Sequence, residues 1–266
     1  KNHDTFLHLA CISNDTSFQL NEKLSKTINF DAFEPMVIAA KKSKIKRFIY
    51  ASTSSVYGIS KKKNVRENHK LLPLTLYNKF KGMCEPLLIK HTNDNFEGVI
   101  FRPATVCGYS PKMRFDLSVN ILTNFAYNKK MIKVFGGNQL RPNLHIQDYC
   151  DVVLRLINAP TKKIKNQIFN VGNQNMSINN IAKLVKNTIQ KKYKTKIEII
   201  RTESNDNRSY HINSDKIYRI LKFKPKKNIK DAILEICDGF EKKKIKNSFT
   251  NLNFFNVQKL KKLNVK

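Results

Sequence analysis

Acidic residues are scarce in this sequence: 20 Asp and Glu stand against 50 Lys and Arg, so the 266-residue chain carries a net charge of +30. Cysteine is also scarce, and its five residues form no C-x-x-C pair, which predicts neither a zinc site nor a disulfide framework. No apolar run reaches the roughly 18 residues of a membrane-spanning helix, and no charged-then-apolar signal segment opens the chain. We therefore expect a cytoplasmic protein with reduced thiols, no metal site and no membrane partner.

The positive charge comes mainly from lysine, which supplies 41 of the 50 basic residues, whereas Arg, the better ligand for bases and phosphates, supplies nine. Asn, with 31 residues, is also abundant. The lysines fall in separate short runs, at 41–47, 61–63, 191–196, 242–246 and 259–262. We interpret this pattern as a solvated surface of biased composition, so nucleic acid is expected to bind only nonspecifically, at low salt.

The apolar residues, 41% of the chain, are enough to bury a core in one large domain or two modest ones. Apolar runs that alternate with helical segments predict a parallel sheet with helical crossovers. The expected strands are 5–10, 47–52, 98–102 and 167–171, and the expected helices between them are 20–43, 74–93 and 146–158.

A second group of elements follows, with strands expected at 131–135 and 198–201. Helices are expected at 116–129, 177–191, 214–221 and 228–241, and Ser177 is the expected cap of its helix. The chain begins with Lys and enters its first strand almost at once, so we expect that an N-terminal part of the protein precedes it.

Hydroxyl side chains follow the second expected strand, where residues 52–55 read Ser-Thr-Ser-Ser. The carboxyl end of a parallel strand faces the crevice in which such sheets bind ligands. Downstream, Tyr77 and Lys81 are spaced to share one face of a helix. The Lys81 cation and any cationic cofactor ring nearby are expected to lower the pKa of Tyr77, and Thr53 could bind the same substrate oxygen. A Tyr–Lys pair at this spacing also arises by chance in a Lys-rich chain, but the upstream hydroxyls favour a catalytic interpretation.

Several segments, in this order, resemble the extended short-chain dehydrogenase/reductase family, the NAD-dependent nucleotide-sugar epimerases and dehydratases. They are 8–10 (HLA), 52–58 (STSSVYG), Tyr77 with Lys81, 102–106 (RPATV), 141–148 (RPNLHIQD) and 169–172 (FNVG). The resemblance extends from residue 8 to about 241, and 110–120 resemble a branch that serves bacterial surface polysaccharides. It implies an α/β fold: a Rossmann-like, doubly wound parallel sheet with a smaller C-terminal α/β substrate lobe.

The resemblance also implies a division of the chain. An NAD-binding domain would comprise 1–108 and 143–172, a nucleotide-sugar lobe 109–142 and 173–241, and a Lys/Asn-rich tail 242–266. Family members begin with a strand and a G-x-x-G-x-x-G turn that holds the NAD pyrophosphate. The sequence contains no such turn. We therefore expect an N-terminally truncated fragment that lacks the first strands and the adenine half of the cofactor site.

The site residues implied by the resemblance fall into three groups. The catalytic residues would be Thr53, Tyr77 and Lys81. The residues in contact with NAD would be Leu9, Ala10, Ser13, Asn29, Ser52, Tyr77, Lys81 and Pro103. The nucleotide-diphosphate sugar would be bound by Thr105, Asn120, Arg141 and Arg208, since a diphosphate suits guanidinium and amide donors. A structural ion pair with Asp148 is the alternative for Arg141.

In the family, the tyrosinate removes a proton from a sugar hydroxyl, usually at C4, while that carbon gives a hydride to NAD. The dehydratases place Asp-Glu directly after the hydroxyl residue, whereas this chain has Ser54 and Ser55, which are poor acids. We therefore expect an epimerase that acts through a transient 4-keto sugar in surface polysaccharide synthesis. A 4-dehydrogenase, a dehydratase and a catalytically dead RNA-binding relative are the alternatives. The resemblance also implies a homodimer that pairs helices, one of them the helix with Tyr77.

Overall fold

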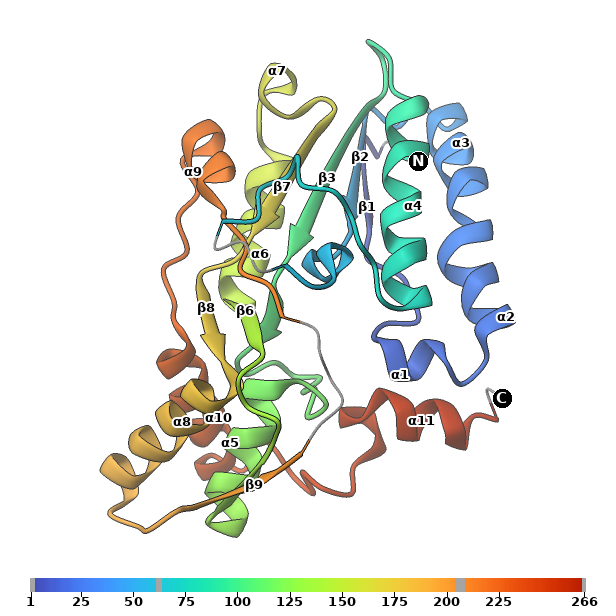
Figure 1. Ribbon diagram of the computed structural model, residues 1–266. Coiled ribbons are helices and arrows are strands. Elements are labelled where there is room, and N and C mark those ends of the chain that lie inside the picture. The colour runs from blue at the N-terminus through green and yellow to red at the C-terminus, as the bar shows by residue number, and fades with distance from the viewer. Residues whose placement is uncertain (1–2, 61–63, 204–208, 265–266) are drawn as a thin grey trace.

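The computed structural model describes residues 3–60, 64–203 and 209–264 (Figure 1). A four-stranded parallel sheet forms the upper half of the molecule in this view. Its strands lie in the order β1 (Thr5–His8), β2 (Arg47–Ala51), β3 (Glu97–Pro103) and β7 (Gln167–Val171). All four strands were predicted from their apolar runs. Because the strands are parallel, their carboxyl ends meet at one edge of the sheet.

Helices cover both faces of this sheet. Phe48 and Tyr50 of β2 pack toward α3 (Phe33–Lys42) and α4 (Leu76–Lys90). Their neighbours Ile49 and Ala51 pack on the opposite face, where α6 (Ile146–Ile157), α7 (Thr161–Ile164) and α9 (Asp215–Leu221) lie. Successive side chains of a strand point to opposite faces, so a strand covered on both sides is a continuous apolar run. This α/β arrangement confirms the predicted Rossmann-like fold.

The predicted single helix at 20–43 is wrong. After α1 (Asp15–Phe18), the chain forms α2 (Glu22–Lys26), a π-helical turn (Thr27–Asp31) and then α3. The turn places Asn29 in the interior, where its side-chain amide accepts a hydrogen bond from the backbone N–H of Ile12 at 2.8 Å and donates to the Ile12 carbonyl at 2.9 Å. A contact between distant residues therefore accompanies the change of helix geometry, and local periodicity does not reveal it.

The lower half holds the second group of elements. The strands β4 (Thr105–Cys107), β6 (Leu140–His145) and β8 (Gln174–Ser177) form a mixed sheet, and β5 (Met131–Phe135) pairs in parallel with β9 (Glu198–Thr202). Three helices share one apolar core here: α5 (Ser118–Lys129), α8 (Ile178–Tyr193) and α10 (Ile229–Glu241). Ser177 caps α8 as predicted, since its hydroxyl accepts a hydrogen bond from the backbone N–H of Asn180 at 3.2 Å.

The C-terminal segment packs onto the rest of the molecule. Phe254, in the 3-10 turn Leu252–Phe254, is buried beside Phe115, whose backbone N–H donates to the Phe254 carbonyl at 3.0 Å. The following helix α11 (Asn256–Lys262) lies against α1 (Figure 1). Apolar anchoring therefore fixes a segment whose order the sequence left open. Within the described ranges, no helix has the length and apolar character needed to cross a membrane.

Candidate active site

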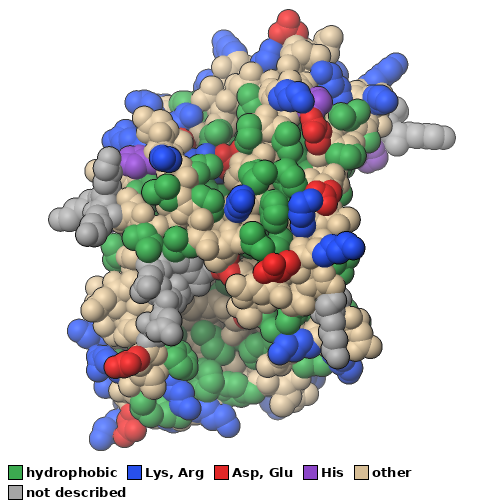
Figure 2. Space-filling model, turned by 45° about the vertical axis from the view of Figure 1, so that its right-hand side comes forward, with side chains coloured by type: hydrophobic (Ala, Val, Ile, Leu, Met, Phe, Trp, Pro, Cys, Tyr) green, Lys and Arg blue, Asp and Glu red, His purple; other side chains and the backbone are tan. Residues whose placement is uncertain are grey.

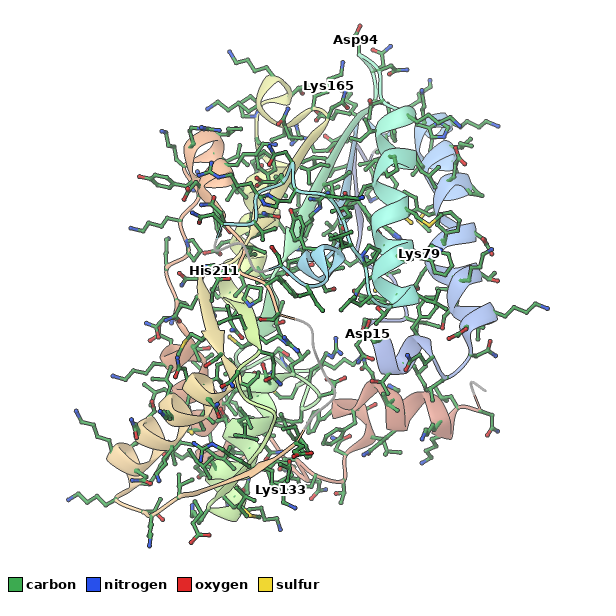
Figure 3. All side chains as sticks on the ribbon, in the orientation of Figure 1. Asp15, Lys79, Asp94, Lys133, Lys165 and His211 are labelled. Carbon is green, nitrogen blue, oxygen red and sulfur yellow. The ribbon has the colours of Figure 1, made fainter. Side chains whose placement is uncertain are left out.

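A cavity of about 880 Å³ lies at the carboxyl ends of β1, β2 and β3, between the two halves of the molecule. Figure 2 shows a hollow near the middle of the face that it displays. Asp15, at the start of α1, and Lys133, on β5, both line the cavity and come from its two sides (Figure 3). An open parallel sheet binds its ligands at this position.

Most of the predicted site residues meet in this cavity. Its lining includes Leu9, Ser13, Ser52, Thr53, Tyr77, Lys81, Pro103, Thr105, Asn120 and Arg141. Of the predicted residues that the structure describes, Ala10 and Asn29 do not belong to the lining: Ala10 is exposed, and Asn29 holds Ile12 from the interior. Arg208 lies outside the described residues. The three predicted catalytic residues therefore face one space.

Thr53 is linked to the helix that carries Tyr77. Its hydroxyl oxygen accepts a hydrogen bond from the backbone N–H of Ser55 at 3.2 Å and so caps the 3-10 turn Ser54–Tyr57. The same oxygen lies 2.8 Å from the hydroxyl of Ser55, which donates onward to the side chain of Asn78 on α4. This chain of contacts holds the Thr53 hydroxyl in the cavity wall.

Lys81 lies one turn after Tyr77 on α4, and its ammonium group is buried. The ammonium donates to the Ala51 carbonyl and lies 4.6 Å from the centre of the Tyr50 ring. Burial lowers the pKa of Lys81, because it disfavours the charged form. An ammonium has three donors, so this contact leaves others for a ligand in the cavity.

The expected lowering of the Tyr77 pKa is wrong for this structure. Burial raises the pKa of the phenol well above its ordinary value, and Cys11 and Asp15 add to the rise, whereas the positive charge of Arg114 opposes it. The Lys81 ammonium is directed at the Ala51 carbonyl. The spacing along the helix was correct, but the depth of the site determines the direction of the shift.

A buried network lies behind the cavity. Arg102, near the end of β3, donates to both carboxylate oxygens of Glu85 on α4, at 2.9 Å and 2.5 Å. Ser52 donates to the same carboxylate at 2.6 Å, and Arg102 also donates to the Tyr57 hydroxyl at 2.6 Å. The Ser52 hydroxyl is therefore engaged within the protein. The sequence analysis did not anticipate this network, although Arg102 lies within a motif that it singled out.

The predicted substrate residues are partly held by the protein itself. The Asn120 side chain accepts a hydrogen bond from the backbone N–H of Gly108 and donates to the Arg114 carbonyl, both at 3.1 Å. Asp148, the alternative partner for Arg141, accepts hydrogen bonds from the backbone N–H groups of Lys226 and Lys227, at 2.8 Å and 3.0 Å.

Three basic side chains of the lining were not predicted, namely Lys112, Arg114 and Lys133. Arg114 donates to both carboxylate oxygens of Asp116, at 3.0 Å and 2.9 Å. The signal that could have found Lys112 and Arg114 is the segment 110–120, which carries a family resemblance. Together these cations suit a ligand with a diphosphate group.

The model of the NAD dependent epimerase/dehydratase family matches residues 1–172, so the chain belongs to this family. Its members use NAD as their cofactor, as the resemblance implied.

Among curated proteins, an uncharacterised protein of Methanocaldococcus jannaschii, MJ1055, is 30% identical over 76% of this chain and 61% of its own length. The UDP-glucuronate 4-epimerase of Thermodesulfobacterium geofontis is 29% identical, over 71% of this chain and 57% of its own length. A human dTDP-D-glucose 4,6-dehydratase is 26% identical, over 89% and 68%. The chain thus matches less than two-thirds of the length of the first two relatives.

A solved structure is also similar. It is the UDP-glucuronic acid 4-epimerase from Bacillus cereus in complex with UDP-glucuronic acid and NAD, with a TM-score of 0.78 and 25% identity. The match covers 90% of this chain and 76% of the other. Both chains therefore share the same overall fold.

The cavity fits the nicotinamide end of NAD. Lys81 offers ammonium donors for ribose hydroxyls, while Leu9, 47% exposed, and Pro103 offer apolar surface for the ring. The residues do not provide the usual site for the NAD pyrophosphate, because the sequence contains no G-x-x-G-x-x-G loop to hold it. The residues present therefore fit the nicotinamide half of the cofactor.

Proposed function

We propose that this chain is the catalytic part of an NAD-dependent 4-epimerase for nucleotide-diphosphate sugars. The observation that carries the proposal is the convergence of Thr53, Tyr77 and Lys81 on one cavity. Both epimerases and dehydratases are similar to the chain, so similarity alone does not decide between the two reactions. The residues that follow Thr53 provide a criterion. Dehydration needs an acid and a base at C5 and C6, and Ser54 and Ser55 are poor acids, which favours epimerisation.

Each residue then has a separate task. NAD, when bound, would supply the acceptor for a hydride from C4. The 4-keto sugar must then turn within the cavity, so that the hydride returns to the opposite face of C4. Tyr77 takes the proton of the C4 hydroxyl and gives it back, and Thr53 holds that oxygen. Lys81 supplies ammonium donors that hold the ligand beside Tyr77.

The lysines and arginines of the lining support a substrate with a doubly charged group, such as a nucleoside diphosphate. UDP-glucuronic acid is the first substrate to test, since the similar epimerases act on or bind it. The resemblance of residues 110–120 to a polysaccharide branch supports a role in surface polysaccharide synthesis.

The test uses the natural protein that contains this chain, with NAD and UDP-glucuronic acid, and identifies the product by NMR. Tyr77→Phe should lower turnover by a factor on the order of 10³, because it removes the proton carrier. Tyr218→Phe, the same change at a tyrosine that is 53% exposed, should leave turnover unchanged. Full activity of Tyr77→Phe would contradict the mechanism. In a second assay with dTDP-D-glucose, which has the 6-hydroxyl that a dehydratase eliminates, a 4-keto-6-deoxy product would show a dehydratase.

We also infer a homodimer from an apolar face on α3 and α4, which lie side by side (Figure 1). Ile38 on α3 is 37% exposed and Met83 on α4 is 39% exposed, and a second copy would bury both. Met83→Asp should convert the dimer to a monomer in light scattering. Leu154→Asp, on the exposed side of α6, should not. A monomeric wild type would contradict the inference.

A further inference from the structure

The hydroxyl of Ser13 lies in the cavity wall between two hydrogen-bond donors from distant parts of the chain. Arg114 Nη1, in the segment before α5, donates to Ser13 Oγ at 3.2 Å. Asn256 Nδ2, in the first turn of the C-terminal helix α11, donates to the same oxygen at 3.0 Å. These two contacts join three segments around one oxygen atom.

A serine hydroxyl has two lone pairs and one proton. With both lone pairs engaged, the proton is left to donate to a third partner, and Ser13 lines the cavity. We propose that Asn256 and Arg114 orient the Ser13 hydroxyl as a hydrogen-bond donor to a ligand oxygen in the cavity. Asn256 is then a positioning residue, and α11 is part of the binding site. The identity of the ligand as NAD or a nucleotide sugar rests on the proposed function.

Both donors are held from behind. Arg114 is bound by Asp116, which also accepts a hydrogen bond at 3.0 Å from Asn14, the neighbour of Ser13. On the other side, buried Phe254 anchors the chain two residues before Asn256, and Val257 lines the cavity. A donor that is already oriented loses little freedom when it binds, so this support strengthens binding.

The acceptor is expected on the cofactor rather than on the sugar nucleotide. Ser13 belongs to the segment after β1, which also supplies Leu9 to the lining on the sheet side of the cavity. The oxygen would belong to a ribose or phosphate group, which both ligands contain, so the experiment needs a separate probe for each.

The experiment compares Asn256→Ala, Asn256→Asp, Ser13→Ala and the double variant Ser13→Ala/Asn256→Ala in the natural protein. NADH is titrated by fluorescence and UDP by calorimetry. Asn256→Ala should weaken NADH binding about five- to tenfold, as expected for one oriented hydrogen bond. Asn256→Asp should weaken it at least as much, because a carboxylate would accept the Ser13 proton. Asn253→Ala is the control and should not change binding. It removes the side chain that accepts a hydrogen bond from Lys259 of α11.

The double variant separates a positioning role from a general structural one. If Asn256 acts through Ser13, the double variant binds NADH no more weakly than Ser13→Ala alone. Additive losses, or unchanged binding of both probes in Asn256→Ala, would overturn the proposal. A loss confined to UDP would support the donor role and place the acceptor on the sugar nucleotide. A protein that shows the NADH losses but converts no nucleotide sugar would disprove the epimerase and support this inference.

Discussion

The carboxylate of Glu85 and the guanidinium of Arg102 form a buried, two-pronged ion pair behind the cavity. Glu85 lies about two turns after Tyr77 on α4, and Arg102 lies near the end of β3. The pair therefore holds the helix with Tyr77 and Lys81 against the edge of the sheet where the substrate is expected.

Removing one partner of this pair would leave the other charge buried and unpaired. Glu85→Ala should lower the free energy of unfolding by about 3 kcal/mol or more, measured by urea denaturation. Asp31→Ala breaks the exposed Lys26–Asp31 pair and should cost less than about 1 kcal/mol. Equal losses of unfolding free energy in the two variants would contradict the expectation that the buried Glu85–Arg102 pair is more costly to break than an exposed pair.

The pH profile of turnover should respond to charges near Tyr77. As kcat/KM reports the free enzyme, its rise with pH should follow deprotonation of Tyr77. Asp15 raises the pKa of Tyr77, so Asp15→Asn should move this rise to lower pH. Arg114 has the opposite effect, so Arg114→Gln should move it to higher pH. Shifts in the same direction would contradict this electrostatic account.

His8 should make the protein less stable in acid. Its ring packs against Tyr50 and Phe33, and burial, together with the charge of Lys81, lowers its pKa to about 4. The unfolded chain binds the proton near the ordinary value of 6.5, so stability is present above that pH and is lost as the pH falls toward 4.

This titration predicts about 2 kcal/mol less free energy of unfolding at pH 5 than at pH 7. His8→Phe keeps an aromatic ring but cannot bind a proton, so its urea denaturation should lack this part of the decrease. The same decrease in both proteins would assign it to other groups.

The lysines should bind RNA weakly. Basic side chains are scattered over the face shown in Figure 2 with some acidic side chains among them, and the whole chain has 50 Lys and Arg against 20 Asp and Glu. Fluorescence anisotropy with a labelled RNA should show binding at about 50 mM salt that is lost by about 200 mM. Tight binding that survives at the higher salt would favour the RNA-binding alternative over the enzyme.

The sheet and most helices could be predicted because their signals are local. The four strands of the main sheet are apolar runs, and Ser177 caps its helix within three residues. The convergence of Thr53, Tyr77 and Lys81 could also be predicted, since parallel strand ends and one helix face have fixed geometry. The helix break at 27–31 could not, because Asn29 bonds to Ile12 through a tertiary contact.

The pattern of residues along the chain, with the family resemblance that it carries, was thus sufficient for the α/β class, the position of the cavity and part of its lining. Only the tertiary structure revealed the direction of the Tyr77 pKa shift, because burial depends on everything packed around the phenol. It also brought Asn256 to Ser13, 243 residues away, through the burial of Phe254 against Phe115. Such contacts depend on which surfaces meet when the chain folds, and no spacing in the sequence encodes them.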